Sequence, residues 1–111
     1  DLKMYSKILS ALTGWEVDET ELLTIGERAL NLQRCFNNRE GMIRKDDMIP
    51  QRLCDLPAFG KYSDVKEVEI KNYEGMLDEY YEARGWDKET GIPLNEKLKE
   101  LELDEIIKGG V

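Results

Sequence analysis

The chain contains no histidine. The side chains left to consider for chemistry are its carboxylates, arginines, tyrosines and two cysteines. Without imidazole there is no Ser-His or Cys-His nucleophile pair and no histidine metal ligand. Cys35 and Cys54 cannot by themselves complete a four-ligand zinc site or hold an iron–sulfur cluster. We therefore interpret both cysteines as buried apolar side chains. No spacing of the carboxylates selects a general acid–base pair.

A dense charge segment covers residues 34–47, where four basic and three acidic residues fall within 14 positions. Such a segment is typical either of a solvated loop or of a buried or interfacial ion-pair network. Its glycine, its adjacent aspartates and the proline that follows favour a loop with a defined path. Arg39 and Arg52 can each form a bidentate pair with a carboxylate, whereas Asp46 and Asp47 alone offer few ligands for a calcium ion. The candidate residues of this loop are Asn37, Arg39, Glu40, Arg44, Asp46, Asp47 and Arg52.

Three aromatic residues, Tyr80, Tyr81 and Trp86, surround Arg84 in the second half of the chain. Such a group can stack on the ring of a ligand, or its members can form cation–π contacts with the arginine. Aromatic residues more often complete a hydrophobic core and keep their polar ends near its rim. We therefore expect Tyr80 or Tyr81, together with Trp86, to complete a core.

The composition limits the partners of the chain. Its 111 residues suit one domain, and 24 acidic against 16 basic residues give a net charge of −8. Nucleic acid is not an expected partner, because its phosphates require clustered lysine and arginine. No apolar run approaches the ~20 residues of a membrane span, and no leader pattern is recognisable, so we expect no membrane partner and a cytoplasmic location. The helical pattern starts directly at Asp1, without a methionine, which indicates a piece of a longer protein.

The elements expected to position these residues are mainly helices. Apolar residues at helical spacing predict a first helix that Gly14 ends. Asp18 is expected to cap a long helix over residues 19–38. Glycine within a helix costs roughly 1 kcal/mol relative to alanine, so Gly26 indicates a close crossing with another helix. The predicted apolar face of the long helix consists of Leu22, Leu23, Gly26, Ala29, Leu30, Gln33 and Phe36.

The second half of the chain is predicted to be less regular. Residues 51–56 fit a helical turn or two, and residues 58–71 fit either a short strand or a covered loop. Asn72 is expected to cap a further helix that Gly85 ends, and Pro93 to begin a short final helix. The expected fold is mainly α, with about four helices and long ordered loops.

Blocks of residues along nearly the whole chain carry a family resemblance. The most specific are Phe36-Asn37, Arg39-Glu40-Gly41, Arg44-Lys45-Asp46-Asp47, Ile49-Pro50 and Arg52. The others are Thr13-Gly14-Trp15, Glu21-Leu22, Gly26-Glu27-Arg28, Asn31-Leu32, Met76-Leu77, Tyr80-Tyr81, Arg84-Gly85-Trp86-Asp87, Gly91-Ile92-Pro93 and Lys97-Leu98. In these blocks the chain resembles the C-terminal helical region of the tungsten-dependent aldehyde ferredoxin oxidoreductase family. The resemblance implies that residues 1–111 are a single C-terminal helical domain of a longer enzyme.

That resemblance implies an anaerobic enzyme that oxidises aldehydes to carboxylic acids and passes electrons to ferredoxin. Full-length members hold a tungstopterin (or molybdopterin) and a [4Fe–4S] cluster between a sheet domain and two helical domains. The family's cluster cysteines and pterin motifs have no counterpart in this sequence, so we expect the chain to bind no cofactor, to contain no catalytic or metal-binding residue and to be inactive alone. The residues distinguish neither tungsten from molybdenum nor aldehydes from the sugar phosphates or aromatic acyl thioesters of related enzymes. One departure is Glu102, which stands where the family usually has glycine and weakens the helix end if its backbone is left-handed.

The expected role of the chain is to help wall the cofactor and substrate cavity, with the remaining domains of the same enzyme as its partners. The loop from Asn37 to Arg52 is predicted to face those domains, with ion pairs of Arg39, Glu40, Arg44 and Asp47 fixing its path. Separated from the rest, the chain is expected to expose an apolar patch and to self-associate. The alternative is a stand-alone acidic helical protein-interaction module.

Overall fold

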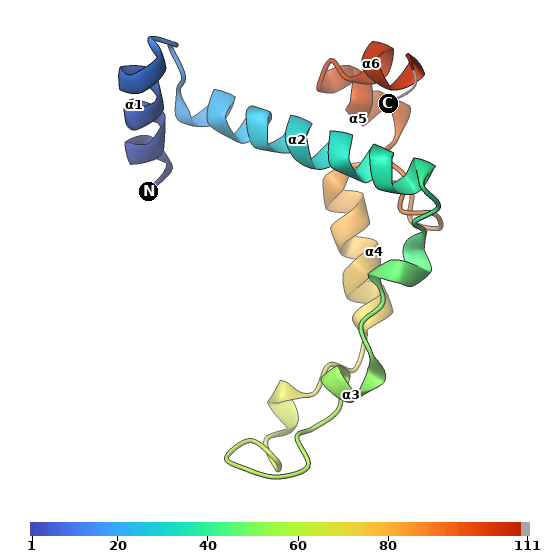
Figure 1. Ribbon diagram of the computed structural model, residues 1–111. Coiled ribbons are helices and arrows are strands. Elements are labelled where there is room, and N and C mark those ends of the chain that lie inside the picture. The colour runs from blue at the N-terminus through green and yellow to red at the C-terminus, as the bar shows by residue number, and fades with distance from the viewer. Residues whose placement is uncertain (110–111) are drawn as a thin grey trace.

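Helices dominate the computed structural model, which describes residues 1–109 (Figure 1). The long ones are α1 (Leu2–Thr13), α2 (Glu19–Arg39) and α4 (Tyr73–Arg84). The short elements are α3 (Gln51–Cys54), α5 (Asn95–Glu100), α6 (Asp104–Lys108) and the 3-10 helices η1 (Arg44–Asp47) and η2 (Lys66–Val68). Between residues 1 and 109 the only β pairing is an isolated bridge of Trp86 with Pro93. The mainly α prediction is confirmed, although the described residues form six α-helices, of which α6 was not foreseen.

The long helices begin and end close to the predicted positions. The side chains of Asp18 and Asn72 accept hydrogen bonds from backbone N–H groups in the first turns of α2 and α4, at 2.8 and 3.1 Å. These bonds satisfy donors that have no partner within the helix. Gly14 and Gly85 follow α1 and α4 in the left-handed conformation. Short-range capping therefore sets where these helices start and stop.

The hydrophobic core lies around the C-terminal half of α2. In Figure 1, α5 and α6 cover one side of this half, α4 leads away from the other, and α1 folds back near the N-terminal end of α2. One buried cluster joins α2 to the C-terminal helices and consists of Cys35, Leu98, Leu101 and Leu103. The other joins α2 to α4 and consists of Leu77, Tyr81 and Trp86, with Leu30 and Tyr73 packed against it. Both clusters depend on α2, which is the central element of the fold.

The face of α2 that is buried differs from the predicted one. Leu23, Gly26, Ala29, Gln33 and Phe36 are exposed, and only part of the predicted stripe, including Leu30, is covered. The buried side chains of the helix are instead those of Asn31, Arg34 and Cys35. Hydrophobic periodicity identifies an apolar stripe but does not say which neighbour covers it. Polar residues occupy the covered face here because they find hydrogen-bond partners there.

The predicted close helix crossing at Gly26 is wrong for the described residues. A Cβ atom built at Gly26 meets nothing within 4 Å, so no other helix among them approaches this point. No contact within the described residues therefore requires glycine at this position.

Residues 55–72 form a projecting loop rather than a strand. The loop contains η2, and the N–H of Ile70 donates to the carbonyl oxygen of Cys54 at 2.8 Å, which closes its base. Phe59 of this loop is 87% exposed. The apolar side chains of this segment are thus largely uncovered by the rest of the chain.

The whole chain is extended. Its radius of gyration is 18.5 Å and its principal extents are 53 × 35 × 20 Å, whereas a compact chain of this length has a radius of gyration of about 13 Å. Large apolar side chains remain exposed on α1, on α2 and on the projecting loop. An extended chain with uncovered apolar faces gains stability by packing against further protein surface.

Glu102 adopts the left-handed conformation, with φ of 58°, between the buried Leu101 and Leu103. Left-handed backbone costs a non-glycine residue roughly 1–2 kcal/mol, so Glu102→Gly is expected to raise the free energy of unfolding by about 1 kcal/mol. Chemical denaturation measures this change. Glu100→Gly is the control, because Glu100 lies in α5 and glycine there costs roughly 1 kcal/mol. Equal effects of the two substitutions would contradict the explanation.

Candidate functional site

A buried ion pair lies where α2, η1 and α4 meet. Arg34 of α2 is only 6% exposed, and its two terminal nitrogens donate to the two carboxylate oxygens of Asp47 at 3.0 and 2.6 Å. Its Nε donates to the carbonyl oxygen of Gly91 at 2.8 Å. The guanidinium also lies 4.7 Å from the ring centroid of Trp86. We call Arg34, Asp47, Tyr81, Trp86 and Gly91 the Arg34 junction, since one guanidinium holds three segments together.

The aromatic residues complete this junction. Tyr81 is fully buried, and its hydroxyl donates to Oδ2 of Asp47. The indole N–H of Trp86 donates to the side-chain oxygen of the buried Asn31 at 2.8 Å. Tyr73 donates its hydroxyl hydrogen to the backbone carbonyl of Asp47 at 2.8 Å. The prediction that one of the two tyrosines completes the core together with Trp86 is therefore confirmed for Tyr81, whereas Tyr80 is 42% exposed. The polar ends of Tyr81 and Trp86 bind the polar centre.

The charges of the junction are mutually stabilised. Burial alone disfavours the ionised form of Asp47, but hydrogen bonds from Arg34 and Tyr81 outweigh it, so the pKa of Asp47 lies below its ordinary value. Burial, together with the adjacent Asp47 carboxylate, raises the pKa of Tyr81 to about 12. At neutral pH, which lies above the pKa of Asp47 and below that of Tyr81, Asp47 is ionised and Tyr81 keeps its proton. Every hydrogen bond of the junction is therefore present at this pH.

Alkaline pH is expected to weaken the fold through Tyr81. Its pKa is about 12 in the folded chain, against 10.0 for an unperturbed tyrosine. Its contribution to stability is complete below the unfolded pKa and falls as the pH rises from about 10 to about 12, by up to roughly 3 kcal/mol. Denaturant unfolding at pH 9, 10, 11 and 12 measures the loss. Tyr81→Phe is the control, and an unchanged loss in that variant would assign the effect to other groups.

Three of the residues predicted for the 37–52 loop lie at or beside the junction. Asp47 is its carboxylate, and Asp46 caps η1 by accepting a hydrogen bond from the N–H of Ile43 at 2.8 Å. Arg44 forms an ion pair with Asp78 of α4 at 2.7 Å. Its guanidinium also donates hydrogen bonds to the backbone carbonyl oxygens of Glu74 and Lys88. These contacts give the loop a single path between α2 and α4.

The other predicted loop residues lie at the surface or shape the turn. Arg39 and Glu40 contact each other at 3.1 Å at the exposed end of α2. The backbone carbonyl of Asn37 accepts a hydrogen bond from the N–H of Met42 at 2.9 Å, which turns the chain out of the helix. Arg52 is exposed on α3, and its side chain forms no ion pair with any residue between 1 and 109. The structure therefore does not gather all seven candidates into one site.

The sequence-based selection missed Arg34, the central residue of the junction. Arg34 lies in the dense charge segment, but nothing in its spacing distinguished it from the surface arginines nearby. One available signal was its position three residues after Asn31, which puts two polar side chains on one stripe of α2. Gly91 was missed as well, although it belongs to one of the blocks of the family resemblance.

The described residues, 1–109, contain no group of three or more cysteine, aspartate or glutamate side chains that could hold a metal ion. Cys35 and Cys54 are buried, unpaired thiols in separate parts of the fold, and burial raises the pKa of Cys35. These residues do not fit a tungsten or iron–sulfur ligand set. In the same part of the chain, no helix is long and apolar enough to cross a membrane.

Comparison with known proteins identifies the family. Residues 1–103 match the family model described as aldehyde ferredoxin oxidoreductase, domains 2 and 3. The chain belongs to this family. It is 39% identical over 104 residues to the tungsten-containing aldehyde ferredoxin oxidoreductase of Pyrococcus abyssi, and 35% identical over 104 residues to that of Thermococcus kodakarensis. Both alignments cover 93% of this chain but only 16% of the relative, so the chain spans about one sixth of these family members.

A solved structure contains a segment with a similar arrangement of helices. It is the active site complex BamBC of benzoyl coenzyme A reductase, in complex with 1,5-dienoyl-CoA. The similarity covers 97% of this chain and 15% of that chain, with a TM-score of 0.72 and 30% sequence identity. The extended arrangement of the helices therefore also occurs within a much larger chain.

Proposed function

We propose that residues 1–111 form the C-terminal helical domain of an aldehyde:ferredoxin oxidoreductase. The match of residues 1–103 to the family model carries this proposal. In it, the enzyme oxidises an aldehyde to a carboxylic acid in the cytoplasm and passes the electrons to ferredoxin. In the same proposal, other domains of the enzyme hold the tungstopterin (or molybdopterin) and the [4Fe–4S] cluster.

Within that enzyme, the domain acts by shape and packing. Its radius of gyration of 18.5 Å and its uncovered apolar faces suit a segment that lies against a larger body. The loop from residue 37 to residue 52 faces the other domains and helps to wall the cavity for cofactor and substrate. The Arg34 junction supports this role, because Arg34 and Arg44 fix the loop between α2 and α4. A stand-alone interaction module does not account for the family match over nearly the whole chain.

A second substrate class has one observation in its favour. The matching solved structure belongs to a benzoyl coenzyme A reductase and was determined with a dienoyl-CoA. An aromatic acyl thioester is therefore the alternative to an aldehyde as substrate. Assays of the purified full-length protein with reduced or oxidised ferredoxin and each substrate class distinguish the two activities.

The mass of the native polypeptide tests the proposal directly. An antibody raised against these 111 residues is expected to detect a band several times larger than 12.9 kDa in the source organism. The larger protein, purified without oxygen, is then expected to contain tungsten or molybdenum together with iron. A native band at 12.9 kDa would overturn the proposal that the chain is part of a larger enzyme. The stand-alone interaction module would then remain as the function.

Gly26→Ala provides a test of domain packing that is independent of activity. In the chain alone, alanine is expected to raise the free energy of unfolding by up to about 1 kcal/mol, because its methyl group meets open space. In the full-length enzyme, the same substitution is expected to be destabilising if another domain approaches this face of α2. Thermal unfolding of the isolated chain and of the full-length enzyme, each with and without the substitution, measures the sign of the stability change in both proteins. Stabilisation of equal size in both would show that this face stays uncovered.

A further inference from the structure

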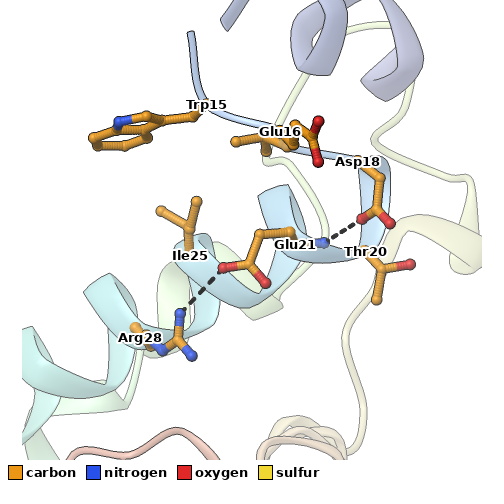
Figure 2. Close-up of a pocket in the computed structure, with 8 residues that line it drawn as sticks. Trp15, Glu16, Asp18, Thr20, Glu21, Ile25 and Arg28 are labelled. Carbon is orange, nitrogen blue, oxygen red and sulfur yellow. Dashed lines mark hydrogen bonds and ion pairs between the residues drawn. The ribbon is translucent and has the colours of Figure 1, made fainter. Parts of the chain in front are cut away.

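A groove opens between the connection after α1 and the first turns of α2 (Figure 2). Its volume is about 670 Å³. Figure 2 shows the indole ring of Trp15 on one side, with Ile25 and Glu21 of α2 on the other and Arg28 at the far end. The groove thus combines an aromatic wall, an aliphatic wall and charged groups in a space that accepts a long side chain.

Trp15 contributes little to the core of this chain. Its side chain is 63% exposed, and it belongs to neither hydrophobic cluster. Among residues 1–109 its indole N–H has no hydrogen-bond partner. The backbone on both sides is nevertheless fixed, because the N–H of Trp15 donates to Oγ1 of Thr13 at 3.2 Å and Val17 is buried and bonded to Ser10. The fold therefore holds a large aromatic ring over the groove without using it internally.

The charge of the groove favours a cation. Three carboxylates, those of Glu16, Asp18 and Glu21, line it against one arginine, Arg28. Arg28 already donates to the carbonyl oxygen of Leu101 at 3.1 Å and to Glu21 at 3.4 Å. Within the described part of the chain, Glu16 has no ion-pair partner. The groove therefore keeps an excess of negative charge next to an exposed indole ring.

These surfaces match an arginine side chain in particular. An indole face is the strongest aromatic partner for a cation, and a carboxylate binds a guanidinium through charge-assisted hydrogen bonds. In this arrangement the guanidinium of the incoming arginine lies against the indole face of Trp15, with Glu21 lining the same groove, and its apolar stem packs along Ile25. Arginine loses less on leaving water than lysine does, because the guanidinium is more weakly hydrated.

We propose that this groove receives an arginine side chain from the part of the enzyme outside these 111 residues. The proposal rests on the proposed function, in which other domains pack against this one. About five sixths of the length of the matched relatives lies outside the aligned segment and is available to supply the arginine. A second copy of this chain is a poorer occupant, because each copy carries a net charge of −8 and an equally acidic groove.

Site-specific photo-crosslinking in the full-length protein identifies the occupant. Trp15 is replaced by p-benzoyl-phenylalanine, which keeps an aromatic ring in place, and the irradiated protein is digested and analysed by mass spectrometry. We expect cross-links to an arginine-containing peptide outside these 111 residues. Cross-links to a second copy of residues 1–111, to a segment without arginine, or to nothing would each overturn the proposal. A native polypeptide of 12.9 kDa refutes the proposed function instead, so the two failures are distinguishable.

A double-mutant cycle then tests whether the contact holds the domains together. Trp15→Ala is expected to speed limited proteolysis at the domain boundary roughly tenfold, the effect of losing a partly desolvated cation–π contact. Replacing the cross-linked arginine by alanine is expected to give a similar increase, and the double variant no further increase. Trp15→Phe keeps an aromatic face and is expected to lie between the wild type and Trp15→Ala. Additive effects of the two alanine variants would overturn the contact.

Discussion

Replacement of Arg34 by alanine is expected to lower the free energy of unfolding by about 3–5 kcal/mol, the usual cost of leaving one charge of a buried pair alone. The substitution removes two hydrogen bonds to Asp47 and one to the carbonyl of Gly91. It also removes the cation from the ring of Trp86. The carboxylate of Asp47 is left partly buried, with the hydroxyl of Tyr81 as its remaining side-chain hydrogen-bond donor. Equilibrium denaturation with urea, followed by far-UV circular dichroism, measures the loss.

Two companion variants separate the buried pair from a general effect of removing an arginine. Arg39→Ala, at the exposed end of the same helix, is expected to cost less than about 1 kcal/mol. Asp47→Ala is expected to be destabilising too, and the double variant of Arg34 and Asp47 to cost clearly less than the sum of the single variants. A cost below about 1 kcal/mol for Arg34→Ala, or strict additivity, would mean that packing rather than the ion pair holds these segments.

The sequence predicted the features that depend on local interactions. Capping by Asp18 and Asn72 and termination at Gly14 and Gly85 involve only a few neighbouring residues, so sequence spacing sets them. The left-handed backbone of Glu102 was raised only as a condition, from the family resemblance, because the family usually has glycine at this position. Such features require no knowledge of what packs against the helix.

The face of α2 that becomes buried could not be obtained in this way. The apolar stripe of the helix is more hydrophobic than the stripe that carries Asn31 and Arg34, yet the polar stripe is covered by α4 and the turn before α5. A buried polar side chain is acceptable only where partners are in place. The partners of Arg34 lie 13, 47 and 57 residues away in sequence, and no periodicity reports such pairings.

The same reasoning explains why the loop candidates have different fates. Asp46 and Asp47 are adjacent and chemically identical, but one caps η1 through a neighbouring N–H and the other pairs with α2. Arg44 and Arg52 also look equivalent in sequence, but only Arg44 faces a carboxylate of α4. Tertiary geometry, rather than residue type, divides the loop into buried and surface positions. Apolar residues left uncovered on α2 are then free to meet other domains in the proposed enzyme.

Gly91→Ala is expected to be the second most damaging single substitution, with a cost of roughly 2–5 kcal/mol. Gly91 is buried and has φ of 71°, a conformation that costs other residues about 1–2 kcal/mol. A Cβ atom there would also collide with the guanidinium of Arg34 and lie 2.8 Å from the hydroxyl oxygen of Tyr81. Crowding of this kind in a packed site typically costs a further 1–3 kcal/mol or so. Because both neighbours are held by Asp47, neither can move without breaking the junction.

Gly60→Ala is a matched control for the backbone contribution. Gly60 also has a positive φ, 99°, but a Cβ atom there meets nothing within 4 Å, so its substitution carries the backbone strain alone. The excess cost of Gly91→Ala over Gly60→Ala, measured by urea denaturation, therefore reports the collision with the junction. In an Arg34→Met background, which removes the guanidinium, this excess is expected to shrink. An excess that is absent in the wild type, or that persists unchanged without the guanidinium, would show that Gly91 serves the turn and not the packing of Arg34.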